Sequence, residues 1–108
     1  MKFTTFVPIK RNDGPPFDEA WLKRVVQRFW KPFRGMTDEG LVEGYCTAKD
    51  GRVYNDLSKK ICIECDRERL QEAIRAVRRL GRKLEQQTMW FEVTGYDGVQ
   101  FIDISEHV

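Results

Sequence analysis

Residues 59–84, KKICIECDRERLQEAIRAVRRLGRKL, change their hydrophobic period at a single residue. Up to Cys65, the side chains alternate with the period of two that is typical of a strand. From Asp66, whose carboxylate suits the N-cap of a helix, the apolar residues recur at helical spacing. We therefore expect a strand and then a helix at about residues 67–86. The expected buried stripe of this helix is Leu70, Ala73, Ile74, Val77, Leu80 and Leu84.

The residues before this stretch predict a strand, a helix and a hairpin. The helix is expected to start at an Asp18 cap and to end before Pro32. Asp50-Gly51 is a strong hairpin-turn signal, and the polar run at 55–60 predicts a bulge or break in the returning strand. Residues 33–40 are expected to be a connection. The expected elements are a strand at 2–9, a helix at 18–31 and hairpin strands at 41–48 and 53–65.

The residues after the stretch complete the predicted fold. TMWFEV at 88–93 is typical of a strand, Asp97-Gly98 predicts a turn, and 99–104 predicts a last short strand. This order predicts a ferredoxin-like βαββαβ domain of the α+β class with an extra C-terminal strand. Its antiparallel sheet would carry both helices on one face, with the first and third strands central. We expect one domain over residues 1–108.

Composition limits the possible functions only weakly. A chain of 108 residues with 41% hydrophobic and 33% charged residues is typical of one soluble globular domain. No apolar run is long enough to cross a membrane, and no export signal is seen at the start, so we expect reduced thiols and a cytoplasmic protein without a membrane partner. A net charge of +2 does not by itself indicate a polyanionic partner.

The period of two also predicts which face of the sheet each side chain occupies. The helices should cover Phe3, Thr5, Val7, Ile61, Ile63, Met89, Phe91 and Val93. The open face would then display Thr4, Phe6, Lys60, Cys62, Glu64, Trp90 and Glu92. On the first hairpin strand, we expect Val42, Gly44 and Cys46 to face the helices and Glu43, Tyr45 and Thr47 to lie on the open side.

Cys62 and Cys65 have the spacing of a redox pair or of half a zinc site. On a regular strand, however, they point to opposite faces and lie roughly 10 Å apart, too far for a disulfide. Zinc needs four ligands, and the remaining candidates are Cys46 and His107. We therefore expect structural cysteines, no metal and no cofactor.

The second predicted helix carries arginines on the side opposite its apolar stripe: Arg75, Arg78, Arg79 and Arg82. They form either a solvated face or, in an alternative interpretation, a footprint for a nucleic-acid backbone. Aromatic residues flanked by carboxylates on the open sheet face argue against base stacking there, because acids repel phosphate.

The open face is the favoured functional surface. A solvated sheet face should be largely polar, whereas this one sets three aromatic rings among carboxylates, which predicts a homodimer interface with a possible small-ligand site. The candidate residues are Phe6, Tyr45, Glu64, Trp90 and Glu92. A small enzyme with an inter-subunit carboxylate site, which would include Glu43, is an alternative. No nucleophile with an adjacent base accompanies these acids, so the sequence favours a binding or association protein over an enzyme.

Several short motifs resemble a pattern in short uncharacterised bacterial proteins of ferredoxin-like fold. They are Phe33-Arg34-Gly35-Met36-Thr37, Gly44-Tyr45, Asp50-Gly51, Tyr54, Asp56 and Gln86-Gln87. The predicted architecture is also similar to that of dimeric α+β barrel proteins, in which two sheets stack. These resemblances imply the fold, and they imply no particular activity.

Overall fold

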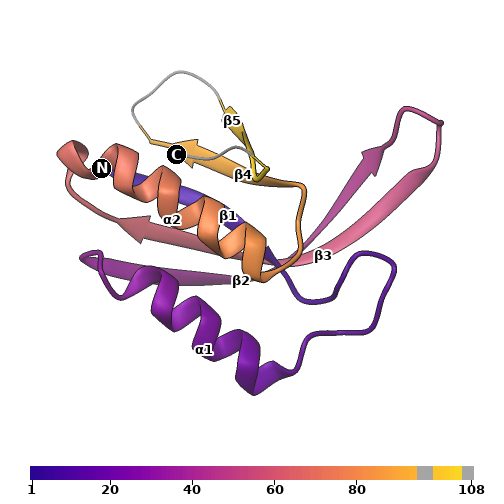
Figure 1. Ribbon diagram of the computed structural model, residues 1–108, viewed down its shortest axis with the longest axis horizontal. Coiled ribbons are helices and arrows are strands. Elements are labelled where there is room, and N and C mark those ends of the chain that lie inside the picture. The colour runs from indigo at the N-terminus through magenta and orange to yellow at the C-terminus, as the bar shows by residue number, and fades with distance from the viewer. Residues whose placement is uncertain (95–98, 106–108) are drawn as a thin grey trace.

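The computed structural model describes residues 1–94 and 99–105 (Figure 1). Its elements are β1 (Lys2–Pro8), α1 (Glu19–Trp30), β2 (Gly35–Thr47), β3 (Val53–Glu64), the 3-10 turn η1 (Arg67–Arg69), α2 (Leu70–Lys83), β4 (Thr88–Val93) and β5 (Val99–Asp103). The five strands form one sheet in the order β2-β3-β1-β4-β5, with every neighbouring pair antiparallel. Both helices lie on the same face of the sheet (Figure 1). The predicted α+β fold of ferredoxin-like type with an extra strand is confirmed. The predicted turn at Asp97-Gly98 lies outside the described residues.

The two helices begin and end for different local reasons. The Asp18 carboxylate accepts a hydrogen bond from the Trp21 backbone N–H at 2.9 Å, as predicted for the cap of α1. Asp66 makes no such side-chain bond, and a 3-10 turn precedes α2. At the other end of α2, Glu85 has a φ of 57° and the Gln86 N–H bonds to the Gly81 carbonyl. This left-handed closure ends the helix before the predicted 86.

The largest difference from the sequence prediction lies in β2. Residues 35–38 belong to this strand rather than to a connection, because their backbone pairs with Glu64 to Ile61 of β3. The irregularity expected at 55–60 lies instead in β2, between Asp38 and Leu41, and β3 is continuous. Gly40 has a φ of 92° there, and its N–H donates to the Asp38 side chain at 2.8 Å.

The bulge reverses the side-chain direction along the rest of β2. Glu43 lies opposite Leu57, and Tyr45 lies opposite Asn55. Residues directly opposite each other in a sheet share a face, so Glu43, Tyr45 and Thr47 lie on the same face as Ile61. The prediction that Val42, Gly44 and Cys46 take this face is therefore wrong.

The core lies between the helices and the sheet. All eight strand residues that were expected to face the helices are buried: Phe3, Thr5, Val7, Ile61, Ile63, Met89, Phe91 and Val93. Leu22, Val26 and Phe29 of α1 and Ala73, Val77 and Leu80 of α2 close this layer. Of the predicted stripe of α2, Leu70 and Ile74 are half-buried and the other members are buried. No helix among residues 1–94 and 99–105 is long and apolar enough to span a membrane.

Candidate functional site

The outer part of the β2–β3 hairpin, residues 41–47 and 53–57, extends beyond the helices and is called the arm below (Figure 1). In the described part of the chain, every large apolar residue classed as exposed lies on the arm. These residues, with their exposed fractions, are Leu41 58%, Tyr45 70%, Val53 65%, Tyr54 38% and Leu57 36%. The arm therefore presents apolar surface that the described residues of the chain do not cover.

A hydrogen-bonded group lies among these apolar residues. The Tyr45 hydroxyl donates to Glu43 Oε1 at 3.0 Å, and Asn55 Nδ2 donates to the same oxygen at 2.7 Å. The Asn55 bond, and then the Tyr45 bond, lower the pKa of Glu43. Glu43 is therefore held as a carboxylate, which does not suit it to act as a general acid near neutral pH.

A hollow of about 480 Å³ separates the arm from the rest of the domain and is called the notch below. One wall is the loop after β1, a second is β3 of the arm, and the third is the connection from α2 to β4. The lining residues include Lys10, Arg11, Asn12, Asp13, Tyr54, Asn55, Asp56, Gln86, Gln87 and Thr88.

Two of the notch walls are connected by an ion pair. Arg11 Nε donates to Glu85 Oε2 at 3.0 Å, and the Arg11 guanidinium lies 4.9 Å from the centre of the Phe17 ring. The Gln86 side chain donates to the Leu84 carbonyl at 3.0 Å. An ion pair thus links the loop to the α2–β4 connection, and these two segments form two of the walls of the notch.

The notch contains several kinds of binding group. Carboxamides come from Asn12, Asn55, Gln86 and Gln87, and each can both donate and accept hydrogen bonds. Lys10 and Asp56 add charges of opposite sign, and Tyr54 adds an aromatic ring. This set can bind a flat, polar molecule. In the sequence, Tyr54, Asp56 and Gln86-Gln87 stand out only for a resemblance, because nothing in a linear sequence shows that three separate segments meet.

The open sheet face holds four of the five predicted site residues. The rings of Phe6 and Trp90 contact each other there, with centroids 5.4 Å apart, and both residues are half-buried. Glu64 and Glu92 are exposed on the same face. Tyr45 is not among them, because the bulge in β2 turns it to the other face. Glu43 is separated from the other two carboxylates for the same reason.

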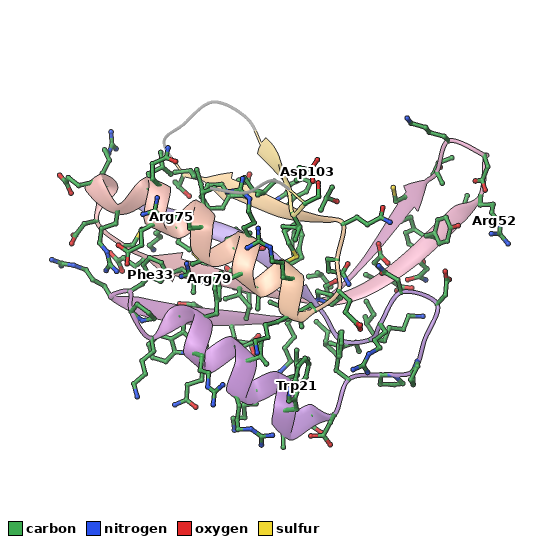
Figure 2. All side chains as sticks on the ribbon, viewed as in Figure 1. Trp21, Phe33, Arg52, Arg75, Arg79 and Asp103 are labelled. Atoms are coloured by element: carbon green, nitrogen blue, oxygen red, sulfur yellow. The ribbon has the colours of Figure 1, made fainter. Side chains whose placement is uncertain are left out.

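The predicted arginine surface is also smaller than expected. Arg75, Arg79 and Arg82 are exposed, and Figure 2 shows Arg75 and Arg79 along α2. Arg78, by contrast, is only 7% exposed, and its Nε donates to the Asp103 carbonyl at 3.2 Å. The strand β5 lies beside this part of α2, so the prediction that Arg78 faces solvent is wrong.

The cysteines occupy three different environments, and all three are free thiols. Cys46 is exposed on the arm, Cys62 is half-buried on the open face, and Cys65 is 1% exposed. Burial raises the pKa of the Cys65 thiol. Within residues 1–94 and 99–105, no group of three or more His, Cys, Asp or Glu side chains is placed to hold a metal ion. His107 lies outside the described residues.

These environments predict an order of thiol reactivity. Because the thiolate is the reactive form, iodoacetamide at pH 8 should modify Cys46 fully before Cys65 reacts measurably. Peptide mass spectrometry of samples quenched over time measures this order. Denaturant provides the control, since unfolding should make the three rates similar. Equal rates for Cys46 and Cys65 in the folded protein would contradict the described burial.

Comparisons with known proteins identify the fold. No protein-family model matches the chain, and no curated protein sequence matches it. The chain is similar to the solved structure of a phage SAM lyase in complex with S-methyl-5'-thioadenosine, with a TM-score of 0.66, 16% identity and coverage of 94% of this chain and 88% of that one. The apo structure of a phage SAM lyase gives a TM-score of 0.62 at 16% identity, covering 99% and 91% of the two chains. At this identity the likeness shows a shared small α+β fold, and none of these comparisons supports the resemblance to short uncharacterised bacterial proteins.

Proposed function

We propose that the protein binds a small, flat, polar molecule of the nucleoside class in the notch, and that it does so as a homodimer. The observation that carries the proposal is that one hollow is lined by Tyr54, by four residues with carboxamide side chains and by charged residues of both signs. Its volume of about 480 Å³ falls within the range of roughly 300–1,000 Å³ that is usual for small-molecule sites.

Each group in the notch suits one part of such a ligand. An aromatic side chain such as Tyr54 can stack on a base, whose edge needs donors and acceptors together. Carboxamides such as Gln87 supply both. Asp56 offers an acceptor for sugar hydroxyls or a partner for a cationic group, and Lys10 offers a partner for an anionic one.

The similarity to phage SAM lyase supports this ligand class, because one of those structures contains S-methyl-5'-thioadenosine. That compound is therefore the first ligand to test. The alternative function for the same site is a small enzyme that acts on a sulfonium nucleoside, with the Asp56 carboxylate near the positive charge. It is tested by incubating the protein with SAM and searching for a cleaved product.

Isothermal titration calorimetry with S-methyl-5'-thioadenosine tests the binding proposal. Loss of base stacking costs about 1–3 kcal/mol, so Tyr54→Ala should weaken binding about 5- to 150-fold. Gln87→Ala should weaken it through the lost hydrogen bonds. Gln71→Ala, at an exposed glutamine of α2, is the matched control and should bind like the wild type. Absence of binding at millimolar ligand, or equal losses in Gln87→Ala and Gln71→Ala, would reject the notch as the site.

A further inference from the structure

We infer that two copies of the chain associate through the arm, with β2 of one copy pairing antiparallel with β2 of the other about a two-fold axis at Gly44. This inference rests on the self-association named in the proposed function and is independent of the ligand. It names the surface and the register of the contact.

β2 lies at the edge of the sheet, so its outer backbone groups have no partner strand among residues 1–94 and 99–105. Natural edge strands are usually protected by lysine, proline, a bulge or a short length. Residues 41–47, LVEGYCT, contain no lysine and no proline, and the bulge lies before them. The one charge, Glu43, is already bonded to Tyr45 and Asn55.

Apolar surface lies beside this edge. Leu41, Tyr45, Val53 and Leu57 share one face, because their partners across the hairpin are Lys59, Asn55, Thr47 and Glu43. Monomeric proteins rarely expose a contiguous apolar patch larger than a few hundred Å². A buried tyrosine alone removes roughly 150–250 Å² from water. A standard interface buries roughly 800 Å² per partner, and these side chains would supply its apolar part.

A second copy of the chain is the partner that suits this edge. A two-fold axis places the same surface on both sides of the contact, and the unprotected edge is complementary to itself. In the register centred on Gly44, Glu43 of each copy faces Tyr45 of the other, so each tyrosine hydroxyl can exchange its bond to Glu43 of its own chain for one to Glu43 of the partner. A register centred on Glu43 would instead set two carboxylates opposite each other, which is unfavourable.

The Gly44 register also makes a geometric prediction about Cys46. It places Cys46 opposite Val42 of the second copy, on the face away from Tyr45. Two Cys46 residues would be four positions apart along the strands, or about 13 Å, which is beyond disulfide range. A cysteine at position 42 would lie opposite Cys46 and within that range.

Light scattering and sedimentation test the contact. The wild type should be a dimer at micromolar concentration, with twice the chain mass of 12.8 kDa. The double variant Leu41→Lys/Tyr45→Lys should be a monomer with unchanged circular dichroism, since both side chains are exposed. Trp90→Glu, on the open sheet face, should remain a dimer. A monomeric wild type would overturn the inference. So would a wild-type dimer that is dissociated by Trp90→Glu and not by the double arm variant.

Mild oxidation tests the register. Val42→Cys should form an intermolecular disulfide with Cys46, and the same change in a Cys46→Ser background should prevent that bond. A Val42→Cys dimer that does not form the 42–46 crosslink would also overturn the inference. These experiments measure mass and crosslinks only. A monomer that still binds ligand would therefore reject the contact and the homodimer and leave the notch standing as the ligand site, and a dimer that binds no ligand would do the reverse.

Discussion

The Phe3→Ala variant is expected to lose about 3–5 kcal/mol of its free energy of unfolding. Phe3 is fully buried at the middle of the core. Its ring centroid lies 5.2 Å from that of Phe91, 5.7 Å from that of Phe33 and 6.3 Å from that of Phe29. Alanine would leave a cavity against β4, α1 and the connection from α1 to β2 together, and no single neighbour can close it.

Urea denaturation followed by circular dichroism measures this loss. Phe6→Ala is the matched control, because Phe6 lies on the same strand, is half-buried and contacts the ring of Trp90. Phe6→Ala should lower the free energy of unfolding clearly less than Phe3→Ala does. If Phe3→Ala does not fold, Phe3→Leu provides the measurable variant, with a smaller loss. Equal losses in Phe6→Leu and Phe3→Leu would contradict the described core.

Gly81→Val is expected to lower the free energy of unfolding by about 1–3 kcal/mol. In an ordinary helix interior, glycine is itself unfavourable, so replacing it can raise the free energy of unfolding. At Gly81, packing decides whether the substitution raises or lowers that free energy. A Cβ atom at Gly81 would lie 2.7 Å from Ile104 Cδ1 and 2.9 Å from Met89 Cγ. The glycine therefore lets α2 approach β4 and the end of β5 closely.

A double-mutant cycle separates the steric effect from helix propensity. Ile104→Ala alone should be destabilising, because Ile104 is buried. Combined with Gly81→Val, it should recover part of the loss, since neighbouring residues that share one space are not additive. Gly35→Val is the control at an unobstructed glycine, where a Cβ would meet no atom within 4 Å. Strict additivity of the two changes would argue against the described contact.

The sequence predicts the fold well because burial imposes a simple period on each element. Ile61 and Ile63 alternate on a strand that has one face in the core, and Val77 and Leu80 repeat on a helix with one buried stripe. Such patterns depend on the secondary structure alone. The order of elements then leaves few topologies to consider.

The features that the sequence analysis missed depend on contacts between distant segments. The bulge at Gly40 adds one residue to β2 and so changes which of the following side chains face the helices. Residues on an edge strand, such as Tyr45, show no burial pattern that would reveal this change. Arg78 lies at the border of the helical stripe, so only the placement of β5 decides its burial. The notch combines three segments, each of which resembles an ordinary polar loop or strand end.

The central position of β1 has a consequence for how the chain folds during synthesis. β1 is translated before the other elements, yet both of its neighbours, β3 and β4, follow much later. At about 5–20 residues per second, several seconds pass between translation of Pro8 and of Thr88. During that time the apolar side of the first strand lacks its full set of partners, and much of its pairing is long-range in sequence, which slows folding. The nascent protein therefore depends on this strand staying free of wrong partners until the ribosome has delivered the strands that enclose it.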